Sequence, residues 1–348
     1  MRISKPYNFH RLRPRCLPGN KTYHQMKRLY LSLIAIALGL SAMAQDSRVA
    51  TLQHGTNFRA YYGTDAFISA HADAADGDVI TLTEGEFNAY DFTKAITIRG
   101  EGMRKTVLKF IGQGYSKIPK DSPYSLCFEG LKLSADGGLA IRNDAGGETL
   151  VFSRCMIELG YNMYVKNCNA VLLNTYYYCN SNDRVFSVED NSSVTCINSI
   201  LTNINGQTFN IQNCVINGKA NVTNSIIKNS IIYEVSTLDN TNTTSNCLLK
   251  EGSSGFTNSW YVKTEPDPNP DPWAEDPETP VLWDELFGED YHLTDAAAAT
   301  YLGTDGTQVG IYGGAYPWNE TPDYPLVKNL EVKGINENGK LQVKINVE

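Results

Sequence analysis

Residues 222–232 read VTNSIIKNSII, and they contain one six-residue phrase twice, with Ile227 shared between the copies. In this phrase an apolar residue, any residue and Asn are followed by Ser and two more apolar residues. Looser copies, in which Arg or Asn precedes Cys, Ser or Thr, are FSRCMI (152–157), VKNC (165–168), LLNT (172–175), CINSIL (196–201), IQNCVI (211–216) and TSNCLL (244–249). The repeat therefore runs through most of the middle of the chain, and it carries more information about fold than about chemistry.

The phrase predicts short β-strands joined by sharp turns, because apolar and polar residues alternate with the period of a strand. Asn adopts left-handed backbone angles more readily than most residues, so it can turn the chain between two strands. The small residue after it can then point inward. One coil cannot bury its apolar face alone, so such repeats stack into a solenoid, with equivalent Asn and Cys side chains about 4.8 Å apart. An antiparallel β-sandwich, which also uses many short strands, is the alternative.

Residues 26–44 have the features of a secretory signal peptide. Met26 and two basic residues precede an apolar run at 29–40, and a small-x-small site predicts cleavage after Ala44. The run is too short for a membrane-spanning helix. We interpret Met26 as the true start and residues 1–25 as a gene-call extension; a long basic n-region is the alternative. The chain is expected to be exported by a bacterium to the periplasm, the outer surface or the medium.

The charge balance disfavours several classes of partner. The whole chain has a formal net charge of −8, with 30 Lys and Arg against 38 Asp and Glu. Residues 1–44 hold eight basic residues and no acidic one, so removing those eight positive charges from −8 leaves −16. Nucleic acid requires a basic surface and is not expected as a partner. The same holds for anionic membranes and, unless calcium bridges the charges, for polyanionic polysaccharides. No cofactor is expected, with calcium as the one open alternative.

An ordered set of elements precedes the repeat. Residues 64–76 have helical periodicity, an acidic Gly turn follows at 76–78, and predicted strands at 79–83 and 95–98 lead to a Gly-x-Gly at 100–102. In order and residue type, residues 64–111 resemble the first coil of the right-handed parallel β-helix proteins of the pectate lyase-like superfamily. The resemblance implies that the short helix caps the open end of the solenoid and covers its strand edges. It does not imply an activity, because fold does not fix function.

The remaining chain divides by composition. We predict a parallel β-helix with its cap over residues 45–264, a Pro-rich acidic loop or linker over 265–280, a closing coil over 281–318 and a C-terminal β-hairpin over 319–348. The closing coil is predicted from a Val-Gly-x-Tyr-Gly ending that resembles the terminal coil of secreted bacterial β-helix proteins. The hairpin either packs on that coil or offers an edge to a partner. The oligomeric state is not determined by the sequence.

The cysteines predict packing more than chemistry. Seven follow the predicted cleavage site: Cys127, Cys155, Cys168, Cys179, Cys196, Cys214 and Cys247. Four of them, at 155, 168, 214 and 247, occupy the same position of the repeat, which predicts an internal ladder of thiols that behave as small apolar residues. No Cys or His spacing suggests zinc. His54, His71 and His292 are interpreted as structural.

Catalytic motifs of the superfamily are missing. The Arg-x-Pro-x-x-Arg phrase of pectate lyases does not occur, nor do the Asn-Thr-Asp, Gly-His-Gly and Arg-Ile-Lys phrases of polygalacturonase-type hydrolases. Glycoside hydrolysis requires two facing carboxyl groups. The candidates in the central coils are Asp183 with Arg184, and Glu189 with Asp190, which flank one predicted strand. Solvated loop charges are the simpler interpretation of these four residues.

Tyrosines offer a second kind of site. Tyr161, Tyr164, Tyr176 and Tyr178 are expected on the outside of strands, where they could stack against sugar rings or could simply suit a strand. We therefore expect a secreted, non-enzymatic protein that binds a polysaccharide or a cell-surface partner. The alternatives are a divergent polysaccharide lyase or glycoside hydrolase, and a structural, adhesin-like surface protein.

Overall fold

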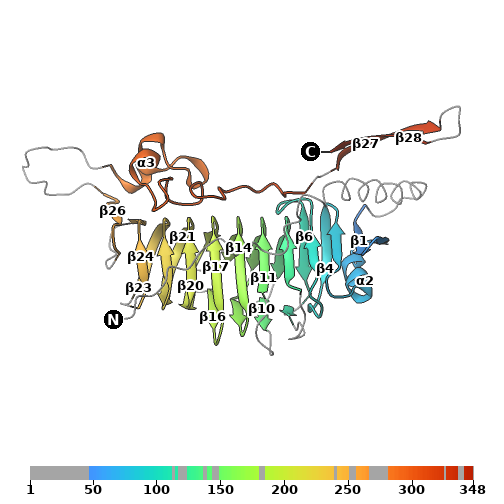
Figure 1. The fold of residues 1–348 in the computed structure, drawn as a ribbon, viewed down its shortest axis with the longest axis horizontal. Helices are drawn as coiled ribbons and strands as arrows, with labels where there is room; N and C mark the ends of the chain where they lie inside the picture. The colour runs from blue at the N-terminus through green and yellow to red at the C-terminus, as the bar shows by residue number, and fades with distance from the viewer. Residues whose placement is uncertain are drawn as a thin grey trace, which may run out of the picture. The chain divides into compact units, whose positions relative to one another are not determined.

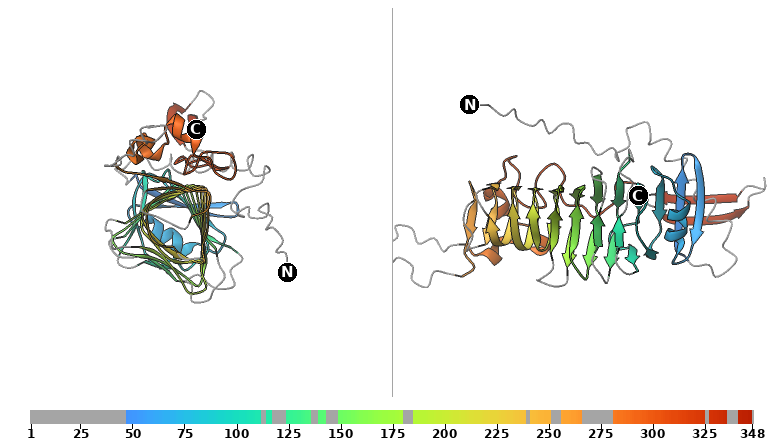
Figure 2. Two further views of the ribbon diagram at one scale, coloured as in Figure 1. Left: turned by 90° about the vertical axis from the view of Figure 1, so that its left-hand side faces the viewer. Right: turned by 90° about the horizontal axis from the view of Figure 1, so that it is seen from below.

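The computed structural model describes residues 47–111, 114–116, 124–135, 139–142, 149–179, 185–238, 241–250, 256–265, 281–324, 327–335 and 341–347. These residues form a right-handed parallel β-solenoid of about seven turns (Figure 1), which confirms the predicted fold class. Seen along its axis, the coils outline a three-sided tube (Figure 2, left). The three sides correspond to three rows of strands, and adjacent coils pair in parallel within each row.

Row 1 contains β3 (Val79–Leu82), β5 (Thr97–Arg99), β8 (Leu126–Glu129), β11 (Thr149–Ser153), β14 (Asn169–Leu173), β17 (Ser193–Ile197), β20 (Phe209–Gln212), β22 (Ile226–Lys228) and β24 (Thr243–Ser245). Row 2 contains β4 (Gly85–Ala89), β6 (Thr106–Phe110), β9 (Lys132–Ala135), β12 (Met156–Leu159), β15 (Tyr176–Cys179), β18 (Ile200–Leu201), β21 (Val215–Thr223), β23 (Ile231–Leu238), β25 (Leu248–Lys250) and β26 (Trp260–Val262). Row 3 contains β7 (Gly114–Ser116), β10 (Leu139–Arg142), β13 (Met163–Lys166), β16 (Phe186–Glu189) and β19 (Ile204–Gln207). The second halves of β21 and β23 continue row 3.

The N-terminal end of the solenoid is covered by other elements. β1 (Val49–His54) pairs antiparallel with β2 (Asn57–Tyr62) and with β3. Helix α2 (Ala66–Asp73), which falls within the helix predicted at 64–76, buries Phe67 in the same core as the first coils. In Figure 2 (left) α2 lies inside the outline of the coils. The core continues as a run of aromatic rings, including a stacked pair of Phe128 and Phe152 with centroids 5.1 Å apart.

The first corner, between rows 1 and 2, explains the repeated Asn. Its residues have left-handed backbone angles, with φ between 45° and 53°: Arg154, Asn174, Asn198, Asn213, Asn229 and Asn246. Asn tolerates these angles at lower cost than most L-residues because its short amide can bond locally. The prediction that Asn marks a turn between short strands is therefore confirmed.

A second corner, between rows 3 and 1, uses the same backbone geometry. Here the left-handed residues are Asn167, Asp190, Thr208 and Asn224, with φ between 48° and 63°. The VKNC copy of the phrase belongs to this corner, so the prediction that Cys168 shares one ladder with Cys155, Cys214 and Cys247 is wrong. Both corners need the same backbone turn followed by a small inward residue, and for this reason the phrase alone does not separate them.

The small residue after the first corner forms a hydrogen-bonded ladder along the axis. The backbone N–H of Thr175 donates to Oγ of Ser199 (3.1 Å), that of Ser199 to Sγ of Cys214 (3.4 Å), and that of Cys214 to Oγ of Ser230 (3.1 Å). Each hydroxyl or thiol donates in turn to the carbonyl two residues earlier, as Ser199 does to Ile197 (2.9 Å). The repeat accepts Cys, Ser or Thr here because each supplies one small donor and acceptor.

All seven cysteines of the described residues are buried. Burial raises the pKa of Cys155, Cys214 and Cys247 to about 12, so almost no thiolate exists near neutral pH. We expect iodoacetamide to label none of the seven in the native chain and all seven in guanidinium chloride, as read by peptide mass spectrometry. Glutathione in the same tube controls for reagent activity. Rapid native labelling of Cys214 would contradict the ladder.

Residues 281–324, called the lateral segment below, lie along the side of the solenoid. They contain η2 (Trp283–Leu286), η3 (Glu289–Tyr291) and α3 (Asp295–Thr300), and none of their described residues joins a parallel row. Trp283 and Leu286 are buried against outward-facing residues of row 2, including Val215 and Ile231, in a second hydrophobic cluster. The observed arrangement differs from the closing coil predicted over 281–318.

The second half of the lateral segment follows the first corner from the last coil back toward the first. The Nδ2 of Asn246 donates to Leu302 O (3.1 Å), and Oδ1 of Asn229 accepts from the Thr304 N–H (2.8 Å). Asn198 donates to Ile311 O (2.7 Å) and Gly313 O (2.6 Å). Asn174 accepts from the Asn319 N–H (3.0 Å), and Arg154 forms an ion pair with Asp323 (2.7 Å). Four of the five corner amides therefore bind the backbone of this segment, and Asn213 is the exception among the described residues.

The contact between corner and segment is close. A Cβ on Gly303 would lie 2.7 Å from Cγ of Asn229, so the backbone of the segment approaches the corner to a distance that only Gly permits. At the far end, the Tyr324 hydroxyl donates to Gly100 O, and Arg104 makes two bonds to the Glu320 carboxylate (2.7 and 2.8 Å). A bidentate Arg–carboxylate pair of this kind fixes orientation as well as distance.

The last described strands, β27 (Val327–Ile335) and β28 (Leu341–Val347), pair antiparallel with each other. Their register places Leu330 opposite Ile345 and Val332 opposite Val343. The predicted loop or linker over 265–280 falls, apart from Glu265, outside the described residues, as does the whole of the predicted signal peptide.

Candidate functional site

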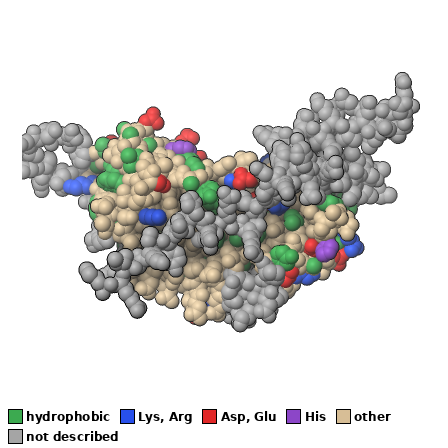
Figure 3. All heavy atoms as spheres, in the orientation of Figure 1, with side chains coloured by type: hydrophobic (Ala, Val, Ile, Leu, Met, Phe, Trp, Pro, Cys, Tyr) green, Lys and Arg blue, Asp and Glu red, His purple; other side chains and the backbone are tan. Residues whose placement is uncertain are grey.

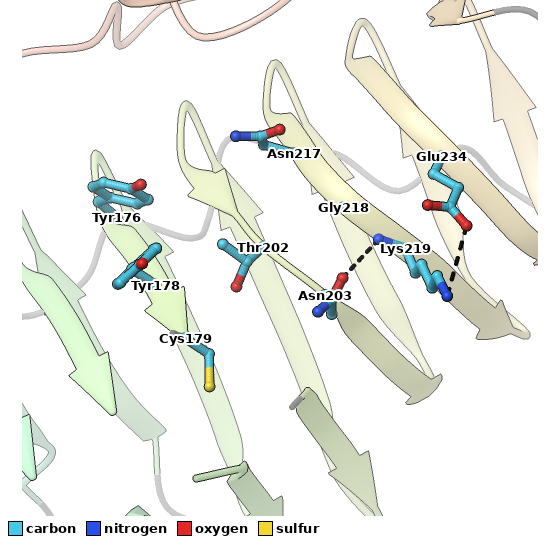
Figure 4. A pocket seen from close by; sticks show the side chains of 9 residues that line it. All are labelled: Tyr176, Tyr178, Cys179, Thr202, Asn203, Asn217, Gly218, Lys219 and Glu234. Atoms are coloured by element: carbon cyan, nitrogen blue, oxygen red, sulfur yellow. Dashed lines mark hydrogen bonds and ion pairs between the residues drawn. The ribbon is translucent and has the colours of Figure 1, made fainter. Parts of the chain in front are cut away.

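A groove of about 520 Å³ opens on the side of the solenoid (Figure 4) and is called the lateral groove below. Its lining residues come from four successive coils: Tyr176, Tyr178, Cys179, Thr202, Asn203, Asn217, Gly218, Lys219 and Glu234. They lie on the outside of row 2 and at the turn that leads from row 2 to row 3. The lining is predominantly polar, with two aromatic rings at one end.

Strand alternation places the two tyrosines. In β15 the side chain of Tyr177 is buried in the core, so the side chains of Tyr176 and Tyr178 on either side of it point outward. Their ring centroids are 6.0 Å apart in an edge-to-face arrangement. Tyr178 is 38 % exposed and offers a ring to solvent. The sequence prediction of outward tyrosines on this strand is confirmed for this pair.

Tyr176 also belongs to the contact with the lateral segment. It packs at the edge of the second hydrophobic cluster, and burial raises the pKa of its hydroxyl, with smaller contributions from the neighbouring Tyr291 and Tyr178. Tyr291 lies on the lateral segment and accepts a bond from Nδ2 of Asn217 (2.5 Å). The lateral segment thus bonds to one of the groove-lining side chains.

Tyr291 is held in an uncommon backbone conformation. Asp290 and Tyr291 have φ of 53° and 64°, two successive left-handed residues without Gly. Strain of this kind costs about 1–3 kcal/mol per residue and persists only where surrounding contacts fix it. Here the fixing contacts are the Tyr233 ring, 6.1 Å from that of Tyr291, and the bond from Asn217.

The floor of the groove is polar and tightly built. Oδ1 of Asn203 accepts from the backbone N–H of Lys219 (2.8 Å), and a Cβ on Gly218 would lie only 2.5 Å from that oxygen. Gly218 is therefore the residue that leaves room for this bond. The Thr202 hydroxyl is buried and has no hydrogen-bond partner among the residues that the structure describes.

One ion pair lines the other end of the groove. Lys219 and Glu234 face each other across β21 and β23, with Nζ and Oε1 3.9 Å apart. Both side chains are more than half exposed, so the pair contributes little to stability. Its effect is on the charge of the groove, which carries one positive and one negative side chain.

Two of the predicted binding tyrosines lie elsewhere. Tyr161 is 50 % exposed in the turn before β13, and Tyr164 is on β13 in row 3. The Tyr164 hydroxyl accepts from Asn162 (2.8 Å), and Nζ of Lys166 lies 5.4 Å from its ring centroid. Neither residue lines the lateral groove, so the four predicted tyrosines do not form one platform.

The two predicted catalytic candidates that the structure describes, Glu189 and Asp190, do not line the lateral groove. Glu189 forms an ion pair with Lys166 and accepts from the Ser187 hydroxyl (3.2 Å), and Asp190 is a left-handed residue of the second corner. Asp183 and Arg184 lie outside the described residues. The groove lining contains a single carboxylate, that of Glu234, whereas glycoside hydrolysis uses two.

A search of the described part of the chain finds no group of three His, Cys, Asp or Glu side chains placed to hold a metal ion. Within that same part, no helix combines the length and the apolar character needed to cross a membrane.

The groove residues beyond the tyrosines were not predicted from the sequence. Cys179, Asn203, Gly218 and Glu234 each stand five residues after a first-corner Asn. Residues at a fixed distance from the corner stack in successive coils, so this offset is the signal that would have found them.

Comparison of the chain with models of known protein families, with characterised proteins and with solved structures gave no match.

Proposed function

We propose that this chain is an exported bacterial β-helix protein of the pectate lyase-like superfamily that binds carbohydrate in the lateral groove without cleaving it. The exposed ring of Tyr178 at the end of a polar groove is the observation that carries the proposal. Aromatic faces stack on the apolar side of a sugar ring, and hydroxyl and amide groups nearby bind its hydroxyls.

The polar groups of the groove suit sugar hydroxyls. Thr202 supplies a hydroxyl, Asn217 an amide, and Lys219 and Glu234 a donor and an acceptor within one groove. The strands that carry them are fixed on both sides by neighbouring coils, so the site is largely pre-formed. Pre-formed sites bind with less loss of conformational entropy.

The test is a glycan-array screen of the full chain, followed by calorimetric titration of each hit and analysis of the products. We expect replacement of Tyr178 by Ala to weaken binding about tenfold or more, as for the aromatic centre of a binding site. Tyr90→Ala is the matched control, because Tyr90 is 52 % exposed and does not line the groove.

Two outcomes would contradict the proposal. Unchanged affinity in Tyr178→Ala would remove the groove as the binding site. New reducing or unsaturated chain ends would show a hydrolase or a lyase instead of a binding protein.

A further inference from the structure

Several charged side chains on the outside of rows 2 and 3 form ion pairs between adjacent coils. In row 2, Lys109 pairs with Glu86 (3.7 Å) and Lys132 with Glu158. In row 3, Lys166 pairs with its direct cross-strand neighbour Glu189. Lys219 and Glu234 repeat this arrangement inside the groove, where they are again direct cross-strand neighbours.

The Lys219–Glu234 pair holds the only charged groups among the nine lining residues. Figure 4 shows the two side chains turned toward each other at one end of the groove, with Asn203 beside Lys219. The remaining lining residues are Tyr, Thr, Asn, Gly and Cys. On the face seen in Figure 3, the part of the lower middle that grey atoms do not cover is mainly tan, the colour of uncharged polar side chains and backbone.

We infer that the lateral groove selects uncharged glycans over acidic ones, and that Glu234 is the residue that sets this selectivity by neutralising Lys219. This inference rests on the proposed carbohydrate-binding function. The ligand class is a neutral oligosaccharide whose hydroxyls meet Thr202, Asn217 and the Lys219–Glu234 pair while one ring stacks on Tyr178.

Electrostatics gives the direction of the selectivity. An acidic glycan such as a polyuronate carries a carboxylate on each sugar, and each would enter a groove in which the one cation already has an anionic neighbour 3.9 Å away. The chain as a whole is also negative, at −8, which repels polyanions before contact. A neutral glycan meets no such repulsion and loses no charged hydration shell.

The sharpest variant is Glu234→Gln, which keeps the size of the side chain and removes its charge. Lys219 is then left as an unpaired cation in the groove. We expect affinity for an oligogalacturonate to rise about fivefold at low salt, the effect of about one ion pair in water. Neutral oligosaccharides of equal length are expected to show no such gain, because they carry no charge that an unpaired Lys219 could attract. High salt should remove the gain, because exposed charges are screened.

Glu86→Gln is the matched control. Its partner Lys109 lies 3.7 Å away, both side chains are about as exposed as those of the groove pair, and neither lines the groove. We expect this variant to change affinity for neither ligand. A fivefold gain in Glu86→Gln as well would mean that overall charge, and not Glu234, sets the selectivity, and the inference would fail.

Titration of the unmodified chain with neutral and acidic oligosaccharides separates the two proposals. Tighter binding of oligogalacturonate by the unmodified chain would overturn the inference on ligand class and leave carbohydrate binding in place. Unchanged selectivity in Glu234→Gln would overturn the role of that residue. Absence of binding to every glycan tested would overturn the proposed function itself.

Discussion

Replacement of Asn198 by Ala is expected to lower the free energy of unfolding by about 3–5 kcal/mol. Asn198 is fully buried, has φ of 45°, and donates to the carbonyls of Ile311 (2.7 Å) and Gly313 (2.6 Å). Ala keeps the left-handed backbone without the amide that favours it, leaves the buried Gly313 carbonyl without this donor, and leaves the Ile311 carbonyl with only the Trp318 N–H (2.8 Å). Denaturant unfolding of the full chain measures the loss.

Two further variants separate the causes. Asn224→Ala is the matched control, because Asn224 has φ of 48° at the second corner and its side chain is exposed, so it should lose only about 1 kcal/mol of backbone preference. Asn198→Gly removes the cost of the left-handed backbone but also removes both hydrogen bonds. It should therefore be more stable than Asn198→Ala by only about 1 kcal/mol, the backbone part of the loss. If Asn198→Ala were no less stable than Asn224→Ala, the corner amides would not hold the lateral segment.

Replacement of Trp283 by Ala is expected to cost about 3–5 kcal/mol, because it empties the centre of the second hydrophobic cluster. Trp283 is 1 % exposed, and its ring lies 5.0 Å from that of Tyr233 and 5.1 Å from that of Phe287. The loss should appear as a lower Tm and as faster proteolysis within residues 281–324, before the coils unfold.

Tyr316→Ala serves as the control for Trp283→Ala within the same segment. Tyr316 is 54 % exposed, so its replacement should change the stability by no more than about 0.5 kcal/mol. A Tm of Trp283→Ala equal to that of the unmodified chain would show that the apolar contact between segment and coils does not stabilise the fold.

The coil architecture was predictable because one local conformation recurs. A left-handed residue followed by a small inward residue is a backbone requirement, and it is visible in the sequence as Asn-Ser or Asn-Cys at each corner. The exchange of Cys for Ser at the inward position, as between Cys214 and Ser230, was visible too. The reason that either residue is accepted is the hydrogen bond from a backbone N–H of the neighbouring coil, and this bond exists only when the coils are stacked.

The course of the lateral segment could not be predicted in the same way. Its bonds to Asn174, Asn198 and Asn229 involve its backbone, so no side-chain pattern in residues 302–319 marks them. The Val-Gly-x-Tyr-Gly phrase at 309–313 is compatible with a turn in a closing coil and equally with a turn in the observed lateral segment. The covered stripe of row 2 carried a signal, since Ile200, Val215 and Ile231 are outward positions that remain apolar.

The candidate site was predictable in part. Alternation along β15 places Tyr176 and Tyr178 outward, and this inference needs only the sequence of that one strand. Lys219 and Glu234 lie opposite each other only because the register of the β21–β23 pair shifts between Ile216 and Lys219. For that reason neither residue stands out in the sequence.

The crystal structure of the full chain with its tightest-binding neutral oligosaccharide is the most direct test of the lateral groove as a glycan site. The predicted result is a sugar ring stacked on Tyr178, with hydroxyls within hydrogen-bond distance of Thr202 and Asn217. A sugar bound elsewhere, for example at Tyr161 and Tyr164 on the row 3 side, with the lateral groove empty, would contradict it.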